Sequence, residues 1–293
     1  MSTNNHQRAH YICTPATGLE KYLLPIAGLF TFIMAWFIFT DAKIVNPNFL
    51  PSPELTFRAF FGLFGDAPPQ VPDHVTGQLR AVQPGFDAFK HSSGVQGIMA
   101  SVSRIVHAMG WACLIGLPIG ILMGAFGRIE AFFGALIPPM RNAPITAFIP
   151  MFMLMFGLEE SLKINFLAFG TLVYIIPTTF DAIRNVPLST IDKAVDLGFN
   201  RLETLQYFVL PAALPRIFQG IGICTGIAWT YLVAAETVNV TDGLGAIVAG
   251  AGRMQNTPKV WAAILLILIL GVITAYGFKL SQKIHILKPE GAQ

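Results

Sequence analysis

The sequence predicts an all-α polytopic membrane protein with six transmembrane helices, and two observations carry this prediction. First, 54% of the 293 residues are hydrophobic and 12% are charged, with a mean hydropathy of +0.60. That is more apolar side chain than one soluble core of this length can bury. Second, the apolar residues gather in runs long enough to cross a bilayer as helices, which takes roughly 17 to 25 residues.

Six such runs lie between charged residues. They are residues 22–40, 105–127, 131–158, 164–180, 217–235 and 260–278. The third contains Arg141 and four prolines, so we expect a span that is irregular in its middle. The first could instead be a secretory signal peptide, but Trp36 and its neighbouring phenylalanines are bulky where a peptidase needs small side chains. We therefore predict a first transmembrane helix over 22–40, preceded by an N-terminal segment over 1–21.

Residues 41–97 differ from the spans because proline, glycine and charged residues recur in them. We expect an external loop. Within it, Ser52 and Pro53 have the positions of a cap and a first helical residue, which predicts a short helix over 53–63 with phenylalanines that could rest at the membrane surface. A loosely ordered loop is the alternative for residues 65–93.

The distribution of basic residues indicates the orientation. An even number of spans places both termini on one side, and the short segments on that side hold more lysine and arginine than the short segments on the other. The positive-inside rule then favours a cytoplasmic N-terminal segment and a cytoplasmic C-terminal tail over 286–293. The connection over 181–216 is long and polar and faces the cytoplasm in this arrangement, whereas the glycine-rich connection over 238–259 is external.

The segment over 187–216 is the most informative part of the chain. It reads PLSTIDKAVDLGFNRLETLQYFVLPAALPR. We expect a short helix that Gly198 ends, then a second helix over 201–209 that Pro211 and Pro215 stop before the next span. An ordinary amphipathic connecting helix is the alternative interpretation.

This segment resembles the cytoplasmic signature loop of ABC importer permeases, which has the form E-A-A, three residues, G, nine residues, I, one residue, L-P. The matching positions are Asp192, Lys193, Ala194, Gly198, Phe208, Leu210 and Pro211. The spacing agrees throughout, while Asp192, Lys193 and Phe208 depart from the usual residue types. The resemblance implies a coupling helix that lies in a cleft of a separate ATPase.

Residues 137–158, 210–236 and 242–248 also resemble the nitrate, sulfonate, taurine and bicarbonate branch of these permeases, so the likeness covers about 98–285. It implies a type I ABC importer permease domain in a bacterial inner membrane that moves a small anion by alternating access. It also implies a permease homodimer, ABC ATPase subunits that hold ATP and Mg, and an extracytoplasmic substrate-binding protein. This chain itself would bind no cofactor and no nucleic acid.

Ionisable groups at membrane depth are costly and usually functional. Arg141 is a candidate for attracting an anionic substrate; alternatively it pairs with Glu236 or caps carbonyls of the broken helix. Glu236 is a candidate gate or ion-pair partner, or else a polar helix end. Further pathway candidates are Thr146, Trp229 and Tyr231. The close spacing of Gly220, Gly222 and Gly226 indicates helix packing.

Two rival functions were weighed on the sequence. A membrane-embedded enzyme would need clustered acids or histidines at one depth, and the sequence holds no phosphate-binding loop, metal-ligand cluster or nucleophile motif. Its cysteines, Cys13, Cys113 and Cys224, have neither metal nor redox spacing. A secondary transporter would be favoured by inverted repeats, which we do not detect. We therefore expect a transport subunit, not an enzyme.

Overall fold

The computed structural model describes residues 19–46, 48–66, 70–72, 79–81 and 85–281. The tail 286–293 and most of the segment 1–21 lie outside this part of the chain. The protein divides into two units, residues 1–58 and 59–293, and each is described by itself.

The first unit holds one long helix. Helix α2 (Glu20–Asp41) contains the predicted first span, and from Leu23 onward no residue in its apolar window is buried. Trp36 Nε1 donates a hydrogen bond to the Pro51 carbonyl at 3.0 Å. Helix α3 (Pro53–Gly62) follows, where Ser52 Oγ accepts from the Leu55 amide, so the predicted short helix is confirmed. Its contact with a membrane surface stays a prediction.

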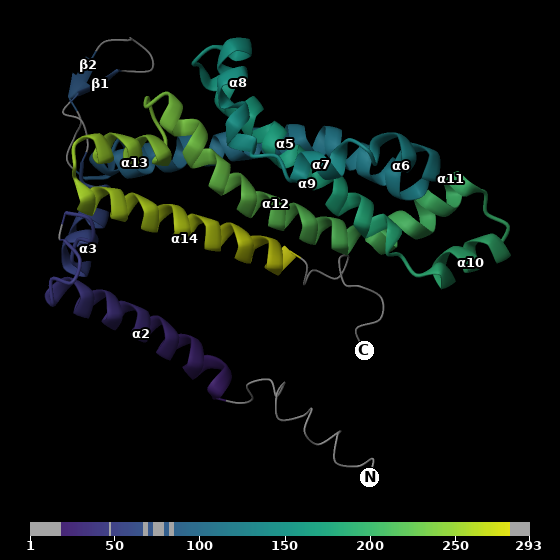
Figure 1. The fold of residues 1–293 in the computed structure, drawn as a ribbon, viewed down its shortest axis with the longest axis horizontal. Coiled ribbons are helices and arrows are strands. Elements are labelled where there is room, and N and C mark those ends of the chain that lie inside the picture. The colour runs from purple at the N-terminus through teal and green to yellow at the C-terminus, as the bar shows by residue number, and fades with distance from the viewer. Residues whose placement is uncertain (1–18, 47, 67–69, 73–78, 82–84, 282–293) are drawn as a thin grey trace. The chain divides into compact units, whose positions relative to one another are not determined.

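The second unit is almost wholly helical, which confirms the predicted fold class. Its elements are β1 (Gln70–Pro72), β2 (Leu79–Ala81), α4 (Phe86–Lys90), α5 (Ser93–Ala125), α6 (Gly127–Phe133), α7 (Ile137–Arg141), η1 (Ile145–Phe148), α8 (Ile149–Phe156), α9 (Glu160–Arg184), α10 (Leu188–Asp196), α11 (Arg201–Thr204), η2 (Leu205–Val209), α12 (Leu210–Val238), α13 (Leu244–Arg253) and α14 (Thr257–Ser281). The exception is the antiparallel β1–β2 ribbon in the predicted external loop, which the sequence did not indicate. In Figure 1, α10 and α11 lie at one end of α12 and α13 lies at the other.

The third of the six predicted spans, expected to be irregular in its middle, is not one continuous helix. Among the described residues, five helices are long and apolar enough to cross a membrane: Leu23–Asp41, Ser93–Ala125, Glu160–Arg184, Arg201–Val238 and Thr257–Ser281. The predicted third span is broken into α6, α7, η1 and α8. Proline explains the breaks, because it lacks an amide hydrogen and its ring clashes with the preceding turn. Pro144 has an extended backbone directly before η1, and Pro150 lies in the first turn of α8.

The broken segment nevertheless runs the length of the bundle. Helices α5 and α9 are parallel, since Gly116 faces Ile175, Gly120 faces Thr179 and Gly124 faces Ile183. The intervening chain must therefore return from the end of α5 to the start of α9. Along this return, successive residues contact α9 from its C-terminal end toward its N-terminal end. They are Glu130 with Arg184, Arg141 with Tyr174, Phe148 with Phe169 and Phe152 with Phe166. The sixth passage exists as a chain of short helices.

Helix α9 lies between α5 and α12, and α12 lies between α9 and α14. The α12–α14 contact includes the Trp229 indole, which donates to Thr274 Oγ1 at 3.2 Å, and the close approach of Gly222 to Phe278. Gly220 likewise lies against Thr178 of α9, whereas Gly226 has no neighbour within 4 Å of its Cβ position. The predicted packing role is therefore confirmed for Gly220 and Gly222 but not for Gly226.

Candidate functional site

The segment between α9 and α12 forms a helix, a tight turn and a second helix. Helix α10 ends at a Schellman-type cap, in which the Gly198 amide donates to the Val195 carbonyl and the Phe199 amide to the Ala194 carbonyl. Gly198 has φ of +82°, a left-handed conformation that glycine adopts without steric cost. The predicted helix end at Gly198 is confirmed.

The second helix restarts through a capping box. Asn200 Oδ1 accepts from the amides of Leu202 and Glu203 at 3.0 Å each, and the Glu203 carboxylate accepts from the Asn200 amide at 2.8 Å. These reciprocal bonds satisfy donors that a helix start leaves open. They fix the start of α11, and Phe199 in the turn packs against the rings of Tyr207 and Phe208 in η2.

The prediction that Pro211 and Pro215 stop this second helix is wrong. Helix α11 continues through the π-helix η2 into α12, and the whole run Arg201–Val238 is helical. Pro211 is accommodated because it lies in the first turn of α12, next to a π-helix whose hydrogen-bond register differs from that of an α-helix. Helices α11 and α12 therefore form one helical run that is long and apolar enough to cross a membrane.

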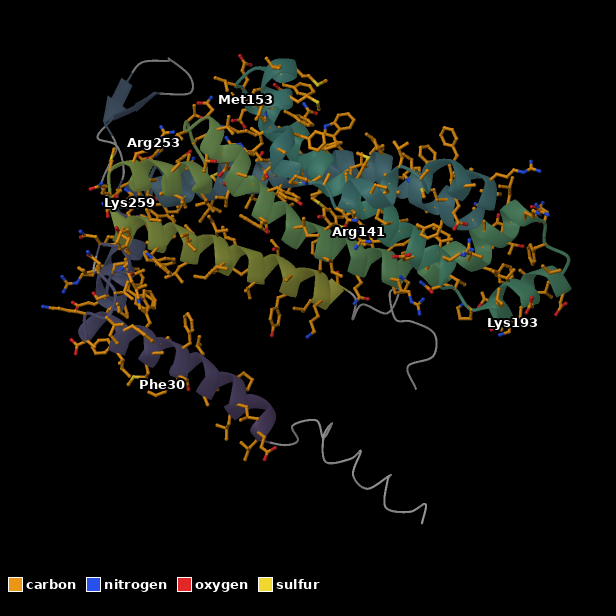
Figure 2. The ribbon with its side chains drawn as sticks, in the orientation of Figure 1. Phe30, Arg141, Met153, Lys193, Arg253 and Lys259 are labelled. Carbon is orange, nitrogen blue, oxygen red and sulfur yellow. The ribbon has the colours of Figure 1, made fainter. Side chains whose placement is uncertain are left out.

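The predicted ATPase-coupling residues separate into two groups. Asp192, Lys193 and Gly198 are exposed, and Figure 2 shows Lys193 at the end of the bundle remote from Arg253. Ala194 is fully buried, and Phe208 packs edge to face on Phe199 with 5.1 Å between ring centroids. Leu210 is half-buried and Pro211 is exposed.

Arg141 lies where the broken segment meets α9. Its guanidinium carbon is 5.8 Å from the centre of the Tyr174 ring, within cation–π range. The Tyr174 hydroxyl is 3.5 Å from the Arg141 carbonyl oxygen and 3.3 Å from the Tyr231 hydroxyl. The structure thus brings two predicted pathway residues, Arg141 and Tyr231, to the same side chain. Tyr174 itself was not predicted, since no local pattern marks it.

The other predicted pathway residues lie elsewhere. Thr146 is exposed on η1, and Trp229 is buried against α14. The alternative pairing of Arg141 with Glu236 is wrong, because the Glu236 carboxylate is bonded to Ser101, Arg104 and the Gly245 amide.

Glu236 belongs to a buried ion network at the opposite end of the bundle from α10. Arg104, which is 2% exposed, donates to Glu236 Oε1 at 2.6 Å and to both oxygens of Glu160 at 2.6 and 2.7 Å, and also pairs with Asp242. Lys163, 1% exposed, donates to Glu160 at 2.9 Å and to Thr241 at 3.0 Å. The network joins α5, α9, α12 and the turn before α13.

Two further features support this network. Glu236 is fully buried and accepts from Ser101 Oγ at 2.8 Å and from the Gly245 amide at 2.7 Å, so its carboxylate is well satisfied. Gly243 has φ of +104°, and a Cβ there would collide with the Glu236 carboxylate. Burial acts to raise the pKa of Asp242, but the hydrogen bond and charge of Arg104 hold that pKa below its usual range.

Glu236 was predicted to be a gate or an ion-pair partner, or else a polar helix end. The ion pair is confirmed, and a gating role stays a prediction. Arg104 and Lys163 were missed, because they were used only as charged boundaries of spans. In the part of the chain that the structure describes, no group of three or more His, Cys, Asp or Glu side chains is arranged to hold a metal ion.

Comparison with known proteins gives a consistent result. Residues 116–283 match the family described as binding-protein-dependent transport system inner membrane component. The chain is 28% identical over 264 residues to the taurine transport system permease protein TauC of Escherichia coli, covering 90% of this chain and 89% of that protein. It is 36% identical over 160 residues to the putative aliphatic sulfonates transport permease protein SsuC of Bacillus subtilis, covering 55% and 58%. It is 27% identical to the bicarbonate transport system permease protein CmpB of Synechococcus elongatus, covering 87% and 86%.

Solved structures give the same fold. The inward-facing MetNI methionine ABC transporter aligns with a TM-score of 0.58 at 19% identity, covering 64% of this chain and 93% of the matched chain. An amino acid ABC transporter aligns with a TM-score of 0.53 at 17% identity, covering 64% and 90%. These likenesses concern the fold of the membrane domain.

Proposed function

Because the chain belongs to the family of binding-protein-dependent transport system inner membrane components, we propose that it is the permease subunit that couples a separate ATPase to uptake of a small anion. The chain is a multi-pass membrane transport component, not an enzyme. The observation that carries the coupling role is the α10–α11 segment, whose second helix continues without interruption into the spanning helix α12.

The exposed face of α10 supports docking to an ATPase. Asp192 and Lys193 are exposed on α10, while Ala194 is fully buried. ATP and Mg are held by the ATPase. Closure of two ATPase subunits moves two α10–α11 units together and opens the spanning helices outward, and hydrolysis returns them to the inward-open state.

Gly198→Val tests this coupling. A β-branched residue with φ of +82° is strained by about 1–2 kcal/mol or more, so the turn between α10 and α11 changes its geometry. We expect uptake by the reconstituted transporter to fall by about tenfold or more, while the amount of protein inserted in the membrane is unchanged, because a Cβ at Gly198 has no neighbour within 4 Å.

Gly198→Asn is the matched control, since asparagine tolerates the left-handed conformation far better than valine does. It should retain most of the uptake. Wild-type uptake by the valine variant would contradict the coupling role, and equal losses in both variants would show that side-chain bulk, not backbone strain, disturbs the segment.

The anionic cargo is supported by Arg141 and by the named relatives. Taurine, aliphatic sulfonates and bicarbonate all carry an oxyanion, which an arginine can bind through two parallel hydrogen bonds. The Arg141 guanidinium lies over the Tyr174 ring, and the Tyr174 hydroxyl is 3.3 Å from the Tyr231 hydroxyl. These hydroxyls can donate further hydrogen bonds to such a group. Nitrate belongs to the same chemical class.

Arg141→Gln is expected to lower uptake of the cognate anion by at least about tenfold, since a charge-assisted hydrogen bond contributes about 1.5–3 kcal/mol. Arg141→Lys should lose less, because it retains the charge but not the planar fork. The measurement is uptake of labelled taurine, an alkanesulfonate and bicarbonate. Undiminished uptake by the glutamine variant would remove Arg141 from the pathway.

The complete transporter requires other subunits: a second copy of this permease, two ATPase subunits and an extracytoplasmic binding protein. In this arrangement the chain lies in a bacterial inner membrane with both termini in the cytoplasm, as six passages and the distribution of basic residues favour. Co-purification of the chain with an ATPase subunit, and uptake that needs ATP, are the expected results. ATP-independent uptake would favour a secondary transporter.

A further inference from the structure

A pocket of about 740 Å³ lies between α10 and α11 and the ends of two spanning helices. Three stretches of chain line it. They are residues 124–128, where α5 ends and α6 begins, residues 183–188, where α9 ends and α10 begins, and residues within 191–209. Its size is within the range of pockets that bind small molecules, about 300–1,000 Å³. In Figure 1 the elements α6, α10 and α11 lie at this end of the bundle.

The charged groups of the pocket all have one sign. Arg128, Arg184 and Arg201 line it, one from each stretch, and the lining contains no carboxylate. Arg184 is paired with Glu130 at 2.6 Å. Arg128 and Arg201 are exposed and make no ion pair or side-chain hydrogen bond within the described residues. Two guanidinium groups are therefore available to an anion.

The remaining lining is mostly apolar. Phe126, Ile183, Val186 and Leu205 are among its side chains, and on α10 it includes Leu188 and Val195, which are 74% and 62% exposed. A small soluble anion would leave this wall uncovered. An amphiphilic anion would cover it and also satisfy the arginines.

The position of the pocket identifies the amphiphile. Ala125 and Arg184 are the last residues of two helices that are long and apolar enough to cross a membrane, so we expect the pocket to lie near the boundary between hydrocarbon and water. Basic pockets between spanning helices at this depth bind anionic lipid headgroups, and arginine binds phosphate oxygens through two parallel hydrogen bonds.

We propose that this pocket binds one anionic phospholipid, whose phosphate lies on Arg128 and Arg201 and whose acyl chain follows the apolar wall below α10. The lipid then fills the space between the coupling segment and the bundle. The proposal depends on the membrane location of the helices and not on ATP-driven transport, so its failure and a failure of the proposed function are distinguishable.

The test uses the purified full chain in a mixture of phosphatidylglycerol and phosphatidylcholine, with bound lipid identified by native mass spectrometry. The wild-type protein should retain phosphatidylglycerol selectively. Arg128→Gln combined with Arg201→Gln should weaken that binding by roughly 30-fold, since each basic residue near the surface contributes about a fivefold factor. Both arginines are exposed, so the fold should survive.

Two further variants sharpen the result. Val195→Asp places a carboxylate in the pocket and should also reduce phosphatidylglycerol binding. Arg253→Gln is the matched control, because Arg253 is an exposed arginine at the opposite end of the bundle (Figure 2), and it should retain lipid as the wild type does.

Three results would overturn the proposal. Equal retention of both lipids by the wild type would show that there is no anionic site. Unchanged retention by the double arginine variant would place any site elsewhere. Displacement of the lipid by an equal concentration of glycerol 3-phosphate would identify a soluble anion as the ligand.

Discussion

Arg104→Met is expected to cause the largest loss of stability of any single substitution considered. It leaves Glu236 fully buried without a cation. It also removes one of the two cations that pair with Glu160 and Asp242, the other being Lys163. Removing one member of a buried ion pair costs about 3–5 kcal/mol, because the remaining charge is desolvated and uncompensated. The measurement is the temperature at which the detergent-solubilised protein loses its monodisperse peak in size-exclusion chromatography.

Two controls separate this effect from a general effect of charge removal. Lys259→Met breaks the exposed pair of Lys259 with Asp66 at 2.9 Å and should cost less than about 1 kcal/mol. Adding Glu236→Gln to Arg104→Met removes the unpaired buried charge and should recover part of the lost stability. A melting temperature of Arg104→Met equal to that of Lys259→Met would show that the network contributes little.

Gly120→Leu is expected to disrupt the packing of α5 on α9. A Cβ at Gly120 would lie 2.6 Å from Thr179 Cβ and 2.7 Å from the Ile176 carbonyl oxygen. Because a backbone atom cannot turn aside as a side chain can, the two helices must separate. Overpacking typically costs about 1–3 kcal/mol, and we expect reduced thermal stability and reduced yield of folded protein.

Gly110→Leu is the matched control on the same helix, since a Cβ there has no neighbour within 4 Å. It should change stability little, or raise it by about 0.5–1 kcal/mol through the lower flexibility of a non-glycine residue. Similar destabilisation by both substitutions would show that glycine is needed in α5 for a reason other than helix contact.

The glycine contacts illustrate what local patterns reveal. The sequence analysis associated packing with Gly220, Gly222 and Gly226, and the first two do contact another helix. The closest approach, however, lies along α5 at Gly116, Gly120 and Gly124. Spacing of four residues places them on one face, but nothing in the sequence says which helix that face meets.

The ion network shows a similar limit. Arg104 was interpreted as the charged boundary of a span that began at the next residue, because charges usually flank spans. In the structure α5 begins at Ser93 and carries Arg104 well inside it. The charge is tolerated because its partners Glu160, Glu236 and Asp242 come from distant parts of the chain. Their meeting depends on the register of three helices.

The sequence by itself determined the membrane location, the helical class and the α10–Gly198–α11 segment. Each of these depends on interactions between neighbours in the chain: runs without charge that partition into lipid, a glycine with φ of +82° that ends α10, and prolines that break the third passage.

Only the tertiary structure decided the partners: Arg104 with Glu236, Arg141 with Tyr174, and the pocket between α10 and the ends of α5 and α9. The physical reason is that helix formation is local, whereas contacts between helices depend on the rotation and register of each helix against its neighbours. Those are set by the close packing of side chains that are far apart in the sequence.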